Sequence, residues 1–510
     1  MSYFSGVSMT AMRVARVASA ALLFLICTSC GETYRPVAFP IIPNPPNPGT
    51  AHYIVTLSAD GMDPDPATTS QQPFSGDATR FNTSGDSIAA ETATGLGTVH
   101  AAVLPNGTAW YAANSLDDTI SASTTSASST HTTIALTDTP GVPAMPVFVE
   151  TTENGNIYVA NYNYGTVSVI NTASNVVVAD IAVDPAAGIP NPAAHPVALT
   201  ELPNATKVYS VNQGNGTVTS INTIDRTVGA VLTGLGASPV AAAARSDSQR
   251  LYILDKTTGN ISVINPTTTP ETFLGTVSTA AGADFLLYDG KLNRLYVLSS
   301  AGNELWAFDA SPSLPASLLA APKSMVAPGT GSPCSASVAP VPTSLVALPD
   351  GSRIYVASYQ KDTSSGTICS QVSVFTSASY AAGNVIPLGS ADIVTDTFNY
   401  PTGCDGARPN PSGPPLGSRL SIASSGDNNP TTRVYVSSCD QGNTSIITTV
   451  TMSSPGLSFQ PDTMVTQLNA PLSTFQPATP VNNTCPNNQV PVNNVCPPPP
   501  QNPLFIVAGP

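Results

Sequence analysis

Charged residues are scarce in this chain. Of its 510 residues, 9% are Asp, Glu, Lys or Arg, against roughly 25% in an ordinary soluble domain. The 17 basic residues are outnumbered by 31 acidic ones, giving a formal net charge of −14, and Lys and Arg form no cluster. Because phosphate binding needs a concentrated basic surface, we exclude nucleic acid as a partner.

The short motifs of common enzyme classes are also missing. The sequence contains no GxSxG, no P-loop, no GxGxxG after a strand and no HExxH. The shortage of charge counts against catalysis as well, because general acid–base work needs titratable groups concentrated in one pocket.

Turn-forming and hydroxyl residues are plentiful instead. The chain has 49 Pro and 37 Gly, and Ser, Thr and Asn fill most other polar positions. These polar side chains compete with the helix backbone for hydrogen bonds, whereas the abundant β-branched residues fit strands. The composition therefore predicts an all-β protein.

The N-terminus has the pattern of an export signal. Arg13 and Arg16 precede the apolar run AALLFLIC (Ala20–Cys27), which is too short to span a bilayer comfortably. Small residues then lead to Cys30, as in a bacterial lipoprotein signal. The usual leucine three places before the lipidated cysteine is replaced by Cys27, so an ordinary secretory signal is the alternative.

Either interpretation exports the protein. We predict a signal peptide over residues 1–29, lipidation at Cys30, and a Pro-rich tether over residues 30–50. Gly31, rather than Asp, after the cysteine favours the outer membrane or cell surface.

One pattern recurs along most of the chain. IYVAN (Ile157–Asn161), TVSVI (Thr166–Ile170) and VVVADIAV (Val176–Val183) have strand length and are separated by turn residues. The segment FVETTENG (Phe148–Gly155) before them supplies another strand and an Asn-Gly turn. Each repeat therefore predicts four short antiparallel strands.

A tyrosine marks the second strand of each repeat. The series is Tyr111, Tyr158, Tyr209, Tyr252, Tyr296, Tyr355 and Tyr435, at intervals of 47, 51, 43, 44, 59 and 80 residues. Four-strand units at this period are typical of β-propeller blades. One tyrosine per blade, inside a strand, indicates packing between blades rather than ligand contact.

An eighth repeat is split between the two ends of the chain. Residues 53–95 provide three strands but no first strand, and LFIVAG (Leu504–Gly509) is the last apolar run. We expect this C-terminal strand to complete the first blade and so remove two exposed edges. The prediction is an eight-bladed propeller over residues 51–475, a Cys/Asn/Pro-rich segment over 476–503 and a closing strand over 504–510; seven blades is the alternative.

The repeat resembles the YVTN-repeat β-propeller family, which includes surface-layer-like and lactonase-like members. The resemblance rests on IYVANYNYGTVSVINTASNVVVADIAV, its copies, and turns such as LPNG and LPDG. It implies the fold. For activity it implies only the alternative of a lactonase-like hydrolase at the channel mouth, because propellers carry many unrelated functions.

Six cysteines follow the signal region. Cys334 and Cys369 are 35 apart, as are Cys404 and Cys439. In both pairs the first member precedes a first strand and the second lies between the second and third strands of that repeat, which places them at one end of a blade. We predict these two disulfides and a third between Cys485 and Cys496, among the fifteen pairings that six cysteines allow. Free thiols and a metal site are the alternatives.

Candidate site residues are few. His100 and His195 lie near the starts of first strands and are candidates for the channel mouth, although a role in local turns is the simpler interpretation. No metal ligand set or cofactor is predicted. Calcium is left open by acidic turns, which contain Asp63, Asp65, Asp117, Asp118, Asp284 and Asp289.

These features favour a non-catalytic envelope lipoprotein. The lipid anchor implies the membrane as one partner. The long insertions in the later repeats imply loops that bind an envelope protein or polysaccharide.

Overall fold

The computed structural model describes residues 53–59, 75–83, 86–125, 131–137, 140–311, 318–327, 332, 334–392, 404, 417–425, 432–450, 452–454, 457–469 and 503–509, all within one compact unit, Tyr34–Pro510. The predicted signal peptide, Cys30, the tether, and Cys485 with Cys496 lie outside the described residues.

The described strands form eight four-stranded antiparallel sheets. Blade 1 contains, from the inner strand to the outer one, β34 (Pro503–Gly509), β1 (Tyr53–Ser58), β2 (Ser75–Asn82) and β3 (Ser87–Leu96). Blade 2 contains β4 (Thr98–Val103), β5 (Ala109–Asn114), β6 (Thr119–Thr124) and β7 (Thr132–Ala135). Blade 3 contains β8 (Pro146–Thr151), β9 (Asn156–Asn161), β10 (Thr166–Asn171) and β11 (Val176–Ala182). Blade 4 contains β12 (Pro196–Glu201), β13 (Lys207–Asn212), β14 (Thr217–Asn222) and β15 (Val228–Leu232).

The other four sheets continue the same order. Blade 5 contains β16 (Pro239–Ala244), β17 (Leu251–Asp255), β18 (Asn260–Asn265) and β19 (Thr272–Ser278). Blade 6 contains β20 (Ala283–Asp289), β21 (Arg294–Ser299), β22 (Glu304–Asp309) and β23 (Lys323–Ser324). Blade 7 contains β24 (Val341–Ala347), β25 (Arg353–Asp362), β26 (Thr367–Thr376) and β27 (Ala382–Asp392). Blade 8 contains β28 (Leu420–Ser424), β29 (Arg433–Ser438), β30 (Asn443–Thr448) and β33 (Thr463–Asn469), with the hairpin β31 (Met452–Ser454) and β32 (Leu457–Phe459) between its last two strands.

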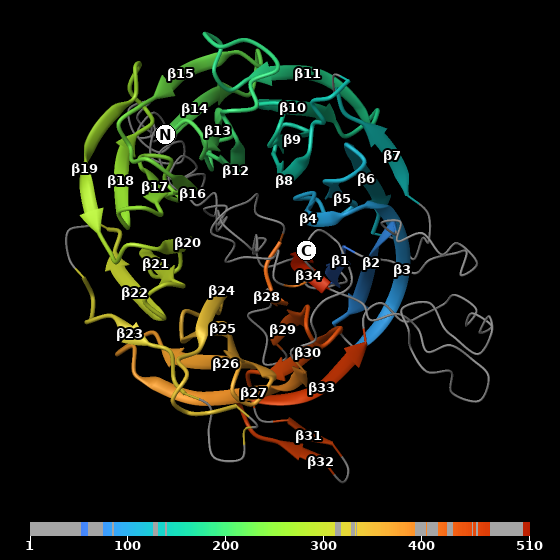
Figure 1. Cartoon of the computed structure of the whole chain (residues 1–510), viewed down its shortest axis with the longest axis vertical. Helices are drawn as coiled ribbons and strands as arrows, with labels where there is room; N and C mark the ends of the chain where they lie inside the picture. The colour runs from blue at the N-terminus through green and yellow to red at the C-terminus, as the bar shows by residue number, and fades with distance from the viewer. Residues whose placement is uncertain are drawn as a thin grey trace, which may run out of the picture. The chain divides into compact units, whose positions relative to one another are not determined.

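The blades stand around a central channel as an eight-bladed propeller, with the inner strands nearest the centre (Figure 1). The C-terminal strand closes the ring, as predicted. β34 pairs antiparallel with β1 from the other end of the chain, and every residue of β34 is buried. The first blade is thus built from both ends of the sequence, and the seven-blade alternative is wrong.

The two faces of the ring are made by different connections. The face at which the inner strands begin, which we call the upper face, also carries the turns between second and third strands. The lower face carries the turns between first and second and between third and fourth strands. This follows from the antiparallel order within each sheet.

An asparagine at the end of the second strand joins the second and third strands in three blades. Asn114 Nδ2 donates hydrogen bonds to Thr119 Oγ1 and Ser121 Oγ, both at 2.9 Å. The same pair of bonds runs from Asn161 to Thr166 and Ser168, and from Asn212 to Thr217 and Thr219. The repeated Asn is therefore a buried fastener inside each blade, where its amide would otherwise lack partners.

The repeated tyrosines hold neighbouring blades together. Their rings are fully buried, and several hydroxyls reach a lower-face turn of the next blade. The partners are Asn175 for Tyr111, Glu271 for Tyr209, the Ala310 carbonyl for Tyr252, Asp462 for Tyr355 and Asp86 for Tyr435. The bond from Tyr435 to Asp86 links blade 8 to blade 1. The expectation that these tyrosines pack between blades is confirmed.

Basic residues accompany the tyrosines. Lys207 Nζ lies 2.6 Å from Glu271, Arg353 pairs with Asp462, and Arg433 Nε lies 3.4 Å from Asp86. Each cation stands two residues before its tyrosine. We call the cation, the tyrosine and their acceptor a seam contact. These six charged residues therefore have a structural role.

Among the described residues, no helix has the length and apolar character needed to cross a membrane.

Candidate functional site

The channel wall is built from one repeated local geometry. In six consecutive blades the ladder between the first two strands shifts register near the start of the inner strand, as a β-bulge does. Proline begins the inner strand in three of them, at Pro146, Pro196 and Pro239, and Pro342 is the second residue of β24. A strand start or a bulge is where a residue without N–H is tolerated. The residues just after the bulge are His100, Phe148, Ala198, Ala241, Phe285 and Ser344.

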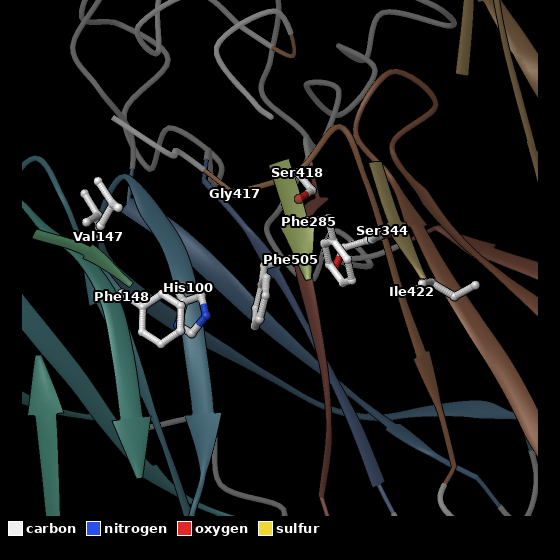
Figure 2. A pocket seen from close by; sticks show the side chains of 11 residues that line it. His100, Val147, Phe148, Phe285, Ser344, Gly417, Ser418, Ile422 and Phe505 are labelled. Carbon is white, nitrogen blue, oxygen red and sulfur yellow. The ribbon is translucent and has the colours of Figure 1, made fainter. Parts of the chain in front are cut away.

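Aromatic side chains line a pocket among the inner strands. The His100 ring stacks on Phe148 with centroids 4.1 Å apart and lies tilted against Phe505 at 4.3 Å. Figure 2 shows these rings together, with Phe285 also lining the pocket. All four side chains are buried, and we call them the channel plug.

The backbone fixes the tautomer of His100. The Val149 N–H donates to His100 Nδ1 at 3.1 Å, so Nε2 carries the proton of the neutral ring. Stacking between two phenyl rings and this bond fix the imidazole orientation. His100 therefore lines this pocket as part of its aromatic packing.

Little space remains in this pocket. Its eleven lining residues also include Ser344, Ser418 and Ser421, and none of the eleven carries a full charge. The cavity measures about 20 Å³, room for roughly one water molecule. Sites for small molecules usually exceed about 300 Å³. This pocket therefore has room for about one ordered water molecule.

His195 lies elsewhere. It precedes β12 on the upper face with φ of 47°, and its ring stacks on Tyr162 at 4.1 Å. Its Nδ1 is 3.3 Å from the Tyr162 carbonyl oxygen, to which it donates in the Nδ1-protonated form. His195 does not line the cavity that His100 lines. The structure thus does not bring the two predicted histidines into one site.

The acidic candidates for calcium build turns. Asp117 accepts a bond from the Leu96 N–H at 2.8 Å, and Asp118 accepts one from the Met145 N–H at 2.7 Å. Asp289 accepts from the Lys291 N–H at 2.9 Å, and Asp284 from the Ser300 hydroxyl at 2.6 Å. Asp63 and Asp65 lie outside the described residues. Among the residues that are described, no group of three or more His, Cys, Asp or Glu is arranged to hold a metal.

Two of the predicted disulfides are present on the upper face. Cys334 is bonded to Cys369 and Cys404 to Cys439. One detail of the prediction is wrong: Cys369 lies inside the third strand, because β25 and β26 extend to ten residues each and include the expected turn.

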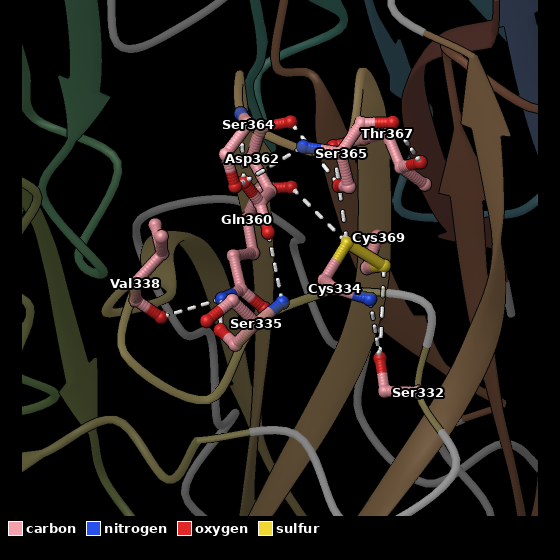
Figure 3. Close-up of a disulfide and its surroundings, with 10 residues drawn as sticks. All are labelled: Ser332, Cys334, Ser335, Val338, Gln360, Asp362, Ser364, Ser365, Thr367 and Cys369. Carbon is pink, nitrogen blue, oxygen red and sulfur yellow. Dashed lines mark hydrogen bonds between the residues drawn. A yellow bond between two sulfur atoms is a disulfide. The ribbon is translucent and has the colours of Figure 1, made fainter.

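Polar contacts support the Cys334–Cys369 bond (Figure 3). The Asp362 carboxylate accepts bonds from the Ser364 hydroxyl at 2.6 Å and from the Ser335 N–H at 2.9 Å. These bonds, led by that of Ser364, hold the pKa of Asp362 well below its usual range. Gln360 Nε2 donates to the Val338 carbonyl at 2.6 Å. The disulfide loop is thereby ordered against β25.

Sequence reasoning missed the phenylalanines of the plug. Their signal was available: Phe148 follows a Pro-Val pair at a strand start, as Ala198 does in the next repeat. It also passed over Glu150 and Glu201, acidic residues inside first strands that are buried in the structure.

Neither protein-family models nor curated proteins match this sequence. Solved structures resemble it distantly. The periplasmic gluconolactonase of Pseudomonas aeruginosa is 15% identical, covering 68% of this chain and 97% of its own, with a TM-score of 0.46. The dihydro-heme d1 dehydrogenase NirN is 15% identical over 70% of this chain and 80% of its own, with a TM-score of 0.47. Kuenenia stuttgartiensis hydrazine synthase is 15% identical over 59% of this chain and 89% of its own, with a TM-score of 0.43. Similarities this low give no argument about activity.

Proposed function

We propose that this protein is an exported envelope lipoprotein whose propeller is a non-catalytic scaffold. In this proposal Cys30 carries the lipid anchor at the outer membrane or cell surface. The upper face binds a protein or polysaccharide partner through its loops.

The channel plug carries this proposal. Enzyme sites need an open pocket with convergent titratable groups, and the pocket lined by the channel plug holds about 20 Å³ with no charged lining residue. The seam contacts already use Lys207, Arg353 and Arg433. The described charges thus support a structural role.

The upper face supports a binding role. The insertions that interrupt the repeat on this face are held by the two described disulfides. Tyr162 and His195 are partly exposed on the same face. Rigidly held loops and aromatic side chains are common components of binding surfaces. We call Tyr162 and His195 the mouth pair.

Binding is tested with the mature chain against envelope polysaccharide fragments and envelope proteins by biolayer interferometry. We expect Tyr162→Ala and His195→Ala to weaken binding at least fivefold. Ile224→Ser, which changes a lower-face residue that is 90% exposed, is the matched control and should bind normally. If Tyr162→Ala and His195→Ala both bind as tightly as the Ile224→Ser control, the upper face is not the binding surface.

Activity and anchoring need separate assays. Hydrolysis of simple lactones should not exceed the rate without enzyme. Turnover that disappears in His100→Ala would establish the lactonase-like alternative instead. Labelling with a fatty-acid analogue should be lost in Cys30→Ser; labelling of neither form would remove the anchor and leave the scaffold untouched.

A further inference from the structure

Exposed apolar side chains are concentrated on one part of the ring. Among the described residues, nine large apolar side chains are exposed. Two of them, Leu116 and Ile189, lie in connections of the upper face. The other seven lie at the lower ends of blades 3 to 6, and we call them the apolar rim: Val176, Val178, Ile224, Phe273, Leu274 and Leu318–Leu319.

The antiparallel order of the blades puts these side chains at one level. Val176 is the first residue of β11 and Phe273 the second of β19, and both are fourth strands, which begin at the lower face. Ile224 lies in the lower-face turn between β14 and β15. Leu318 bridges to Phe308, next to the lower end of the third strand β22. The apolar rim therefore follows the lower edge of four consecutive blades on one side of the ring (Figure 1).

The other four blades differ at this level. Their fourth strands begin with Ser87 in blade 1, Thr132 in blade 2, Ala382 in blade 7 and Thr463 in blade 8. The apolar residues that follow in blades 1 and 8, Ile88 and Met464, pack against the core. Single exposed apolar residues are ordinary, whereas a set gathered along one edge indicates a contact surface.

The chain enters the ring at the same face. β1 is a second strand and so begins at the lower face, where the Tyr53 hydroxyl donates to the Gly107 carbonyl at 3.1 Å. Between Cys30, the predicted lipidation site, and Tyr53 lie 22 residues (53 − 30 − 1), which can span at most about 70 Å. An anchor at Cys30 therefore favours a membrane below the lower face.

A bilayer fits the apolar rim better than a protein partner does. Protein interfaces bury their apolar contacts in one compact core inside a polar surround, whereas these side chains are spread over four blades at one level. A flat apolar phase can meet all of them at once. Attraction to anionic lipid is not expected, because the chain has a net charge of −14 and Asp225, next to Ile224, is exposed.

We infer that the apolar rim inserts into the surface of a zwitterionic lipid bilayer, with the lower face towards the membrane. This inference rests on the proposed function, because the anchor at Cys30 supplies the membrane. Blade 1, where the chain enters, and the rim lie on opposite sides of the ring (Figure 1). Anchor and rim together therefore hold the lower face against the bilayer, and the mouth pair points away from it towards a partner.

The first test uses the mature chain with Cys30→Ser, so that no lipid is attached and only the rim can bind. This chain should float with phosphatidylcholine vesicles in a density gradient, and added anionic lipid should not strengthen the binding. Val176→Thr combined with Phe273→Thr, which gives these strands the threonine start of blades 2 and 8, should weaken binding at least fivefold. Leu116→Thr combined with Ile189→Thr makes the matched change on the upper face and should leave flotation unchanged.

Insertion itself gives a second readout. Vesicles of brominated phosphatidylcholine should quench the added tryptophan fluorescence of Phe273→Trp but not that of Leu116→Trp on the upper face. A chain that neither floats nor shows this quenching would overturn the inference and leave the rim to a protein partner. Equal flotation of the rim variant and its parent would overturn it as well.

A second copy of the chain is the remaining occupant. Sedimentation velocity without lipid should give a monomer; a dimer that Val176→Thr with Phe273→Thr dissociates would assign the rim to self-association and overturn the inference. Labelling at Cys30 tests the anchor separately, so the rim and the proposed function can fail independently. Because the partner assay contains no lipid, Ile224→Ser should still bind the partner normally.

Discussion

The two faces of the propeller follow different rules. On the lower face, four turns between first and second strands are closed by the same hydrogen bond of 2.8 Å: 104–107, 202–205, 245–248 and 348–351. On the upper face, a single residue, Gly97, separates β3 from β4, whereas β27 and β28 are 27 residues apart in sequence (420 − 392 − 1). The repeat is therefore regular on the lower face, where the tyrosines bond neighbouring blades to each other. It is irregular on the upper face.

Each face is stabilised in its own way. The hydroxyl groups of Tyr111, Tyr209, Tyr355 and Tyr435 all bond to lower-face turns of the next blade. Both described disulfides are on the upper face. Repeated side-chain contacts hold the ring together from below, and covalent bonds hold the insertions that break the repeat above. The face without seam contacts is the one free to vary for binding.

Deleting Leu504–Pro510 should have the largest effect, because it reopens the ring on both faces. Leu504, Phe505, Ile506 and Val507 are buried. At about 2 kcal/mol for each buried side chain, the loss is roughly 8 kcal/mol, within the whole stability expected of a domain. Thermal unfolding should show loss of the cooperative transition. A synthetic peptide of residues 503–510 should restore it, and an unchanged midpoint without the peptide would contradict the closure by β34.

Replacing both Cys334 and Cys369 by serine should be the next largest change. The bond closes a loop of 35 residues, which in the chain-entropy account contributes about 4 kcal/mol. Chemical unfolding should show that decrease with the ring still assembled. The same substitutions at Cys404 and Cys439 provide the comparison. If either pair abolished the fold, the upper face would be as essential to the ring as the lower.

The fold was predictable because it is repeated. Seven tyrosines, turn residues and strand-length apolar runs indicated the blades, and the missing first strand indicated closure by Leu504–Gly509. Spacing also predicted two disulfides. These signals are local in sequence, or recur at a fixed period, so a single chain suffices to detect them.

The interface between blades 8 and 1, where the ring closes, has different charged residues at its two ends. At the lower end Arg433 pairs with Asp86, whereas towards the upper end Asp77 is buried beside Glu91. Burial, and then the charge of Glu91, raise the pKa of Asp77 from 3.8 to about 8. The folded state therefore holds a proton that the unfolded chain releases above pH 3.8. Stability from this group is present at low pH and falls as pH rises towards 8.

Asp77→Asn should remove this dependence. Between pH 5 and pH 7 the wild type should lose about 3 kcal/mol that the variant keeps, at about 1.4 kcal/mol per pH unit. Urea unfolding at several pH values measures it. Asp225→Asn is the control, since that carboxyl lies on an exposed turn. Parallel pH curves for wild type and Asp77→Asn would contradict the assignment.

Breaking one seam contact should cost less. Asp462→Ala leaves Arg353 and the Tyr355 hydroxyl without their acceptor. We expect a loss of about 2 kcal/mol, the scale of a partly buried charged hydrogen bond. Thermal unfolding of this variant and of Ile224→Ser, on the same face, separates the seam from the exposed surface. Equal midpoints for the two would mean that packing alone joins blades 7 and 8.

The site was less predictable than the fold, since it depends on contacts between distant segments. His100 and His195 occupy similar places in two repeats, but a bulge puts His100 against Phe505 from the other end of the chain. Glu150 and Glu201 lie in strands of two different blades, and only their burial at a common seam distinguishes them from solvated carboxylates. A repeat pattern predicts equivalent positions and says little about the one place where they differ.

His195→Gly should have the smallest effect on stability and so tests the upper face most directly. Gly97 and Gly282 take the place before the inner strand in blades 2 and 6 with φ of 68° and 82°, and His195 takes it with φ of 47°. Glycine relieves a left-handed strain of about 1 kcal/mol but adds a similar freedom to the unfolded chain. The free energy of unfolding should stay within about 0.5 kcal/mol of the wild-type value, while partner binding becomes weaker. A loss of 2 kcal/mol or more would make the stacking on Tyr162 structural, and the upper face would then share the role of the lower one.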